Sequence, residues 1–386
     1  MNEIEEMDDR DALARHQLQH RADFVAKCFG RLAECDFDPG STEAPDLSID
    51  RLRPKKYLLT ELHSSLLPAL RHHVIGLWQA LSYPQRMPRN AAHILHYVIG
   101  NQPELEMIVD RIIWVINDLI PGRIHKSNQT NDQHFKEFKQ YRLHGLDTSA
   151  RNEMQNELAS FFTQCRGASE QLMLPAGYQI YVQPSSTNDL LRSIDSVIRW
   201  SKGPELHFIY DHWKLAMKSM EKTLDDLLLA MSPEHALYSE PFTELAQTFI
   251  PVIKLSKLFF RKMTTDGMSQ KNLPFYTEMS SDQLSSLKRS ADVITDSVSH
   301  LFFCLPRSDE RHAISSATIF TGEIKKILTR FQSCLLLVDL YIIPRCTEIN
   351  VCSSPTSLKT WIVTWNTLLY QASHNSIQAC ESIVIN

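Results

Sequence analysis

The sequence predicts an all-α protein built of up-and-down helical bundles, with long proline-kinked helices and no significant sheet. Apolar residues recur at intervals of three and four over long stretches, which is the spacing of one face of an α-helix. Glycine and proline, the residues that interrupt helices, account for only 11 and 18 of the 386 residues. The gaps between the helical stretches are turn-sized, which favours antiparallel neighbours in a bundle.

The first 120 residues are expected to form an N-terminal helical unit. A helix is predicted over residues 11–34, and it ends near Asp38-Pro39-Gly40 because proline and glycine stop helices. Residues 41–54 are expected to form a polar linker. A small basic cluster lies at the end of this linker and just beyond it, at Arg51, Arg53, Lys55 and Lys56.

Two further helices complete this unit, and each contains a proline. The first is predicted over residues 55–81, with leucines in steps of three and four, and Pro68 is expected to kink or break it near Leu67. The second is predicted over residues 91–120, with an interruption at residues 100–103.

Residues 121–149 lack a sustained apolar face and open with Pro-Gly, so we expect a polar connector with one short helix around residues 132–142. A helix is predicted over residues 148–165. The segment 178–183 is the one plausible strand. Because one strand cannot make a sheet, this segment is expected to be an ordered connector.

Residues 150–386 are expected to form a C-terminal helical bundle. From Leu206 to Met231 the apolar positions advance by three and four, while lysines and aspartates occupy the opposite face. Four more helices are predicted, at residues 242–263, 281–305, 309–343 and 357–382.

Composition argues against several classes of function. The net charge of −5 provides no positive field for nucleic acid, and no segment offers about 18 uninterrupted apolar residues for a membrane span. The acidic N-terminus does not resemble a secretory signal, which disfavours a secreted effector. We therefore expect a cytoplasmic protein, with a nuclear location also open, whose scattered cysteines are reduced.

No motif names a reaction, so we expect no catalytic, cofactor-binding or metal-binding residues. The chain lacks nucleophile-elbow, phosphate-loop, dinucleotide and zincin signatures, and it contains no Glu-x-x-His pair. Asp225 and Asp226 are adjacent on a helix, but the third position that a magnesium site requires is Leu229, which is apolar. These aspartates are expected to lie on a solvated helix face.

Four segments carry a resemblance: RIIWVINDLIPGRIHKSNQTNDQHFKEFKQYRLHGL (111–146), YDHWKLAMKSMEKTLDDLLLAMSP (210–233), FTELAQTFIPVIKLSKLFFRKM (242–263) and LLTELHSSLLPALRHHVIGL (58–77). Together they resemble an uncharacterised multi-copy family of intracellular helical proteins from rust fungi. The resemblance implies no reaction and transfers no catalytic residues. The helix pattern of the third segment is also similar to cyclin-D-interacting helical-bundle proteins, related to the vinculin and catenin type.

Two hypotheses of function remain open. The first is a non-enzymatic helical-bundle protein that binds an unknown protein partner. Trp361 and Trp365, four residues apart on one helix face, form either bundle core or its partner-docking face. The alternative is an all-α enzyme or small-ligand carrier with a site in a bundle cavity, for which His207 or His212 with Asp211 are the first candidate residues.

Overall fold

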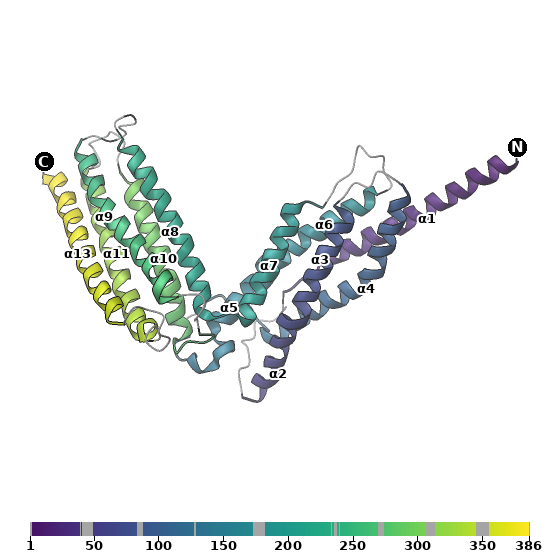
Figure 1. Ribbon diagram of the computed structural model, residues 1–386, viewed down its shortest axis with the longest axis horizontal. Coiled ribbons are helices and arrows are strands. Elements are labelled where there is room, and N and C mark those ends of the chain that lie inside the picture. Colours follow the sequence, from purple (N-terminus) through teal and green to yellow (C-terminus); the bar gives the residue numbers. More distant parts are fainter. Residues whose placement is uncertain are drawn as a thin grey trace. The chain divides into compact units, whose positions relative to one another are not determined.

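The computed structural model describes residues 2–38, 40, 49–82, 88–126, 129–172, 182–232, 234, 238, 240–268, 274–305, 313–344 and 355–385. Over these residues the protein is all-α and contains no strand, as the sequence predicts (Figure 1). Residues 178–181 of the expected strand lie outside the described residues. Val182 and Gln183 are neither helix nor strand and lead into the next helix.

The chain forms two compact units, and each unit is built from two pieces of sequence. Unit 1 combines Met1–Ser127 with Arg142–Gly203, and unit 2 combines Asn128–Tyr141 with Pro204–Asn386. The sequence-based division differs, because it ends the N-terminal unit at residue 120 and begins the C-terminal bundle at residue 150. The helices between residues 148 and 202 bury their apolar faces against the first helices of the chain, and this tertiary contact assigns them to unit 1.

Unit 1 contains α1 (Asn2–Ala33), α2 (Ile49–Glu61), α3 (Leu67–Leu81), α4 (Pro88–Leu119), α6 (Gln155–Gln171), α7 (Pro184–Lys202) and most of α5 (Gln140–Asp147). α1 packs against α6 and α4, and α3 packs against α4 and α7. Phe29 of α1 stacks on Phe162 of α6, with 6.1 Å between ring centroids. Large side chains from helices far apart in the sequence therefore share one core.

The prolines of unit 1 distort its helices less than expected. A π-helical turn, η1 (Leu62–Leu66), joins α2 to α3 directly before Pro68. Because Pro68 has no N–H and its ring crowds the preceding turn, the helix widens there instead of breaking. The interruption expected at residues 100–103 is wrong, since α4 runs through Pro103. The buried Gln102 amide of this turn donates to the Val25 carbonyl of α1 at 3.2 Å, which holds the turn in place.

The linker expected over residues 41–54 is helical at its end. Residues 41–48 lie outside the described residues, and α2 begins at Ile49. The basic cluster therefore lies on a helix, and one of its members is not exposed: the buried Lys55 ammonium donates to the Leu119 carbonyl at the end of α4, at 3.4 Å. This lysine stabilises a helix terminus, where unpaired carbonyls attract cations.

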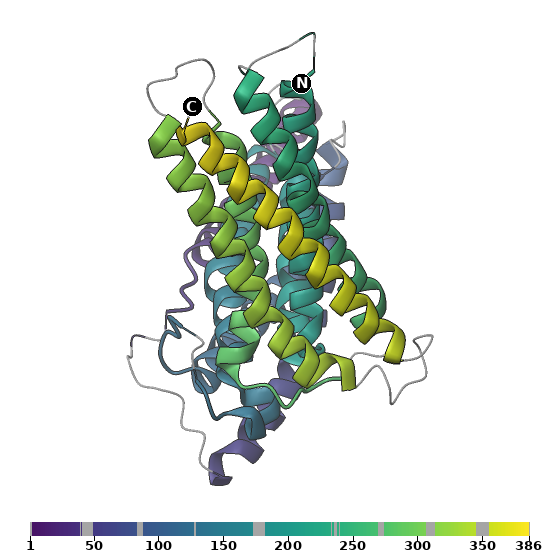
Figure 2. The same ribbon diagram turned by 90° about the vertical axis from the view of Figure 1, so that its left-hand side faces the viewer.

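Unit 2 is a bundle of α8 (Glu205–Ala230), α9 (Glu240–Lys262), α10 (Ser281–Phe303), α11 (Ala313–Leu337) and α13 (Pro355–Ile385). Consecutive helices alternate in direction (Figure 1), and α11 and α13 lie side by side (Figure 2). The contacts close a ring in the order α8, α10, α11, α13 and α9. The five helices predicted from residue 206 onward are confirmed to within a few residues.

Aromatic rings from four helices form the centre of this bundle. Phe259 of α9 lies 4.7 Å from Trp365 of α13 and 5.2 Å from Phe331 of α11, measured between ring centroids. Trp213 of α8 meets Phe260 at 5.0 Å. Both buried indoles are paired, because Trp213 Nε1 donates to the Leu287 carbonyl and Trp365 Nε1 to the Leu255 carbonyl.

Candidate functional site

Residues 129–141, which we call the strap, make the most concentrated set of buried polar contacts in unit 2. The strap contains the short 3₁₀ helix η2 (Gln133–Phe138) and the first two residues of α5. It lies within the expected polar connector, yet Asp132, Glu137 and Lys139 are all buried. The sequence indicates its polarity correctly but does not reveal that this polarity is enclosed.

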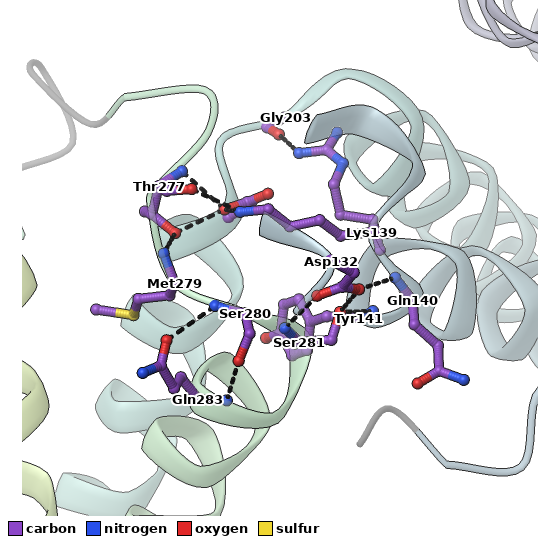
Figure 3. Close-up of polar contacts among 12 residues, drawn as sticks. Asp132, Lys139, Gln140, Tyr141, Gly203, Thr277, Met279, Ser280, Ser281 and Gln283 are labelled. Carbon is purple, nitrogen blue, oxygen red and sulfur yellow. Dashed lines mark hydrogen bonds and ion pairs between the residues drawn. The ribbon is translucent and has the colours of Figure 1, made fainter. Parts of the chain in front are cut away.

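Lys139 anchors the strap to the first residue of α8. Its ammonium lies 3.0 Å from Glu205 Oε2 and donates to the Thr277 carbonyl at 2.6 Å (Figure 3). The backbone N–H and the hydroxyl of Thr277 both donate to the same Glu205 oxygen at 2.9 Å. Neither charged side chain is exposed, so each requires the other for compensation.

Asp132 anchors the strap to the N-terminus of α10. Its carboxylate accepts hydrogen bonds from the backbone N–H and the hydroxyl of Ser281 at 2.8 and 2.5 Å, and from the Gln140 N–H at 2.8 Å (Figure 3). Ser280 and Gln283 form a capping box on the same turn. A carboxylate at this position stabilises the helix because the helix dipole is positive there.

Two buried arginines of unit 1 also hold helix ends, by donating hydrogen bonds to backbone carbonyls there. Arg142 donates to the Gly203 and Trp200 carbonyls at the end of α7, at 2.8 and 3.2 Å. Arg151 donates to Asp147, Asn117 and three backbone carbonyls. Burial lowers the pKa of this guanidinium from its ordinary value, while Asp147 opposes the change. Both side chains thus satisfy carbonyl groups at helix ends.

The strap contacts hold the strap against the starts of α8 and α10, and the buried side chains that make them are not accessible to a ligand. Lys139 and Glu205 are inaccessible, and Glu205 Oε1 is buried without a hydrogen-bond partner among the described residues. Sequence reasoning missed this site because its partners are far apart in the chain. The one local hint is the aromatic spacing of Phe135, Phe138 and Tyr141, which indicates that part of the segment is buried.

The structure separates the two tryptophans predicted for partner binding. Trp365 is 1% exposed and lies in the aromatic centre of the bundle. Trp361 is half-buried, stacks on Trp365 at 6.2 Å and has the Lys262 ammonium 5.9 Å from its ring centroid. Of the two interpretations left open, the structure places Trp365 in the core.

Trp114 is the most exposed of the six tryptophans, all of which are described, with 50% of its surface accessible. Tyr57 and Met107 are also exposed, by 70% and 63%. The Arg111 guanidinium lies 4.4 Å from the Trp114 ring centroid, and it donates to both oxygens of Glu61 at 2.9 and 2.8 Å. We call Tyr57, Met107, Arg111 and Trp114 the α4 surface.

The histidines named for a bundle-cavity site do not converge. His207 pairs with Asp211 on its own helix at 3.3 Å, and His212 pairs with Asp292 of α10 at 2.5 Å. No group of three or more His, Cys, Asp or Glu side chains within the described ranges is arranged to hold a metal ion. None of the helices in the described ranges has the length and apolarity that a membrane span requires.

Unit 2 also has an open groove between α11 and α13, with a volume of about 600 Å³. Ala317, Thr321 and Gly322 line one side, and Cys380 lies on the other. Burial raises the pKa of the Cys380 thiol to about 11, so the thiol stays protonated and is a poor nucleophile.

Two family models match this chain, and the boundary between the two matches coincides with the last boundary between unit 1 and unit 2. Residues 55–202 match the family model of a domain of unknown function, DUF8723, and residues 204–378 match that of another domain of unknown function, DUF8721. No curated protein and no solved structure matches the chain. The chain is thus similar to two successive domains of unknown function, and they meet where unit 1 gives way to unit 2, at Gly203 and Pro204.

Proposed function

We propose that this protein is a non-enzymatic helical-bundle protein that acts by binding a protein partner, and that the α4 surface is its contact site. The observation that carries this proposal is the exposure of Trp114, whose ring is in contact with the Arg111 guanidinium. Tryptophan, tyrosine, arginine and methionine are the residue types enriched in protein interfaces, and all four occur together here.

The α4 surface is also preorganised. The two hydrogen bonds from Arg111 to Glu61 hold the guanidinium over the Trp114 ring before any partner arrives. A side chain fixed in its bound geometry loses less conformational entropy on binding, which raises affinity. The buried residues of α4, such as Ile112 and Val115, lie away from Trp114, so the exposed part of the Trp114 ring does not contribute to the packing of this helix.

A photo-cross-linking amino acid at position 107 tests the proposal in cells. We expect cross-links to a discrete partner that disappear when Trp114→Ala is added. Phe24→Ala is the matched control, because Phe24 of α1 is also 50% exposed in unit 1, and it should leave the cross-links intact. Cross-links that survive Trp114→Ala would show that the α4 surface is not the contact site.

The α11–α13 groove is the observation that favours the second hypothesis, a small-ligand carrier. A Cβ atom on Gly322 would meet no other atom within 4 Å, so a larger side chain has room there. Gly322→Leu should therefore fill the groove without disturbing the helix. A natural small molecule that co-purifies with the wild type and is lost from this variant would support a carrier, whereas its retention would exclude the groove.

A further inference from the structure

We infer that the starts of α8 and α10 form a peptide-binding surface whose ligand is the strap, and that this contact keeps residues 1–203 and 204–386 associated when the peptide bond between them is cut. We call Glu205, Thr277, Ser281 and Asp282 the acceptor surface. The inference does not depend on the α4 surface. It is carried by the path of the chain, by the contacts of the strap and by the shape in which the strap is held.

The strap is contributed to unit 2 by the first part of the chain. Unit 2 takes Asn128–Tyr141 from that part, and the chain then returns to unit 1 until it enters unit 2 again between Gly203 and Pro204. A cut at this bond therefore leaves the strap on one fragment and the acceptor surface on the other. The two fragments also correspond to the two matched domains, so the strap is a segment that one domain supplies to the next.

The first turn of α10 contacts the start and the end of the strap. The Asp282 N–H donates to the Gln129 carbonyl at 2.9 Å. The N–H and the hydroxyl of Ser281 donate to the Asp132 carboxylate, and the Ser281 hydroxyl oxygen accepts the Tyr141 N–H at 2.7 Å (Figure 3). Because N–H groups in the first turn of a helix have no acceptor within that helix, they select a ligand with a carboxylate at this position.

A lysine supplies the second point of recognition. The Lys139 ammonium lies 3.0 Å from Glu205 and donates to the Thr277 carbonyl. Without the strap the buried Glu205 carboxylate would lose this counter-ion, which is costly for a charge inside a protein. The acceptor surface is therefore specific for a segment that carries a carboxylate and, seven positions later, an ammonium, as Asp132 and Lys139 do.

The strap is closed on itself between these two points. The Gln140 N–H donates to Asp132 at 2.8 Å, and the Gln140 side-chain oxygen accepts the Gln129 N–H at 3.0 Å. Between them, the exposed Lys136 has a φ of 52°, a backbone conformation that a residue with a side chain rarely adopts. Such a conformation persists where the surrounding contacts fix it, and here Asp132 and Lys139 are held on either side of it. The strap thus has the properties of a bound peptide loop.

Cleavage of the folded full-length protein tests the inference. A protease recognition sequence is inserted between Gly203 and Pro204, the chain is cut after folding, and a tag on residues 1–203 captures what remains bound. We expect residues 204–386 to be retained, and Asp132→Ala/Lys139→Met to weaken their retention by about tenfold or more.

The control Asp296→Ala/Lys257→Met changes the same residue types in unit 2 outside the strap contacts and should retain residues 204–386 as the wild type does. Separation of the wild-type fragments would overturn the inference. Retention that Asp132→Ala/Lys139→Met leaves unchanged would also overturn it, because the strap would then not be what joins the fragments.

A free strap peptide tests the same surface on the cut protein with the wild-type residues in place, and so does not depend on the folding of the strap variant. A peptide of residues 129–141, added in excess, should displace residues 204–386 from the captured fragment. The same peptide with Asp132→Ala/Lys139→Met lacks both recognised groups and should be less effective by about tenfold or more. Equal displacement by the two peptides, or displacement by neither, would contradict a strap-binding surface.

Discussion

The ammonium of Lys139 lies 3.0 Å from Oε2 of Glu205, and neither side chain is exposed to solvent. The two residues are 66 positions apart, and the pair joins the strap to the start of the C-terminal bundle. A buried ion pair contributes little to stability relative to a well-packed apolar pair, but removing one partner leaves the other charge uncompensated.

Lys139→Met is therefore expected to destabilise unit 2 by about 3–5 kcal/mol, because the Glu205 carboxylate stays buried without its counter-ion. Urea unfolding of the full-length protein measures this change. Lys257→Met breaks an ion pair with Glu221 at the surface of the same unit and should cost at most about 1 kcal/mol. Equal losses from the two substitutions would show that the buried pair has no special role.

Asp132→Ala is expected to cost about 1–3 kcal/mol, since it leaves the buried N–H of Ser281 without its acceptor. Hydrogen exchange should show the loss of protection concentrated in the first turn of α10. Asp296→Ala, at an exposed position farther along this helix, serves as the control and should leave exchange unchanged. A uniform loss of protection along α10 would contradict the capping role of Asp132.

Alanine at Trp365 and at Trp114 should have opposite consequences. Trp365→Ala opens a cavity among the aromatic rings of unit 2 and is expected to cost about 3–5 kcal/mol. Trp114→Ala removes an exposed ring and its contact with Arg111, so its cost should stay below about 1 kcal/mol. Thermal unfolding of both variants distinguishes a core tryptophan from a surface one.

The Glu61–Arg111 pair predicts a dependence of stability on pH. Hydrogen bonding from Arg111 lowers the pKa of Glu61 below its ordinary value of 4.5. A carboxyl group with a depressed pKa adds stability above 4.5, and this contribution is lost as the pH falls through the lowered value. Glu61→Gln should therefore show a smaller drop in melting temperature than the wild type between neutral pH and acid. An identical drop would contradict the pairing.

The helices of unit 2 could be predicted because the spacing of apolar residues within each helix is enough to define it. The steps of three and four from Leu206 to Met231 define a face whatever that face packs against. The unit boundary is different, because whether residues 148–202 pack with α1 or with α8 is decided by tertiary contacts. The buried charges of the strap were unpredictable for the same reason: Asp132 meets Ser281 across 149 positions.

The residues around Trp114 in the sequence predict that this side chain is exposed. It lies one turn from Asp110 and one turn from Asp118, on the charged side of α4, whereas Ile112 and Val115 lie on the buried side. A tryptophan on the charged face of an amphipathic helix is a candidate contact residue. Trp365 shares its face with Leu358, Leu369 and Ala372, all of them buried, so its position predicts the core.

The order of the strap and its partners along the chain has a consequence for synthesis on the ribosome. Asp132 is made 149 residues before Ser281, and at a typical rate of 5–20 residues per second this interval lasts about 7–30 s. During this time the Asp132 carboxylate lacks the two donors of Ser281, and the Lys139 ammonium lacks its acceptor until Glu205 has been made. The nascent chain must keep them hydrated while unit 1, complete at Gly203, can already fold.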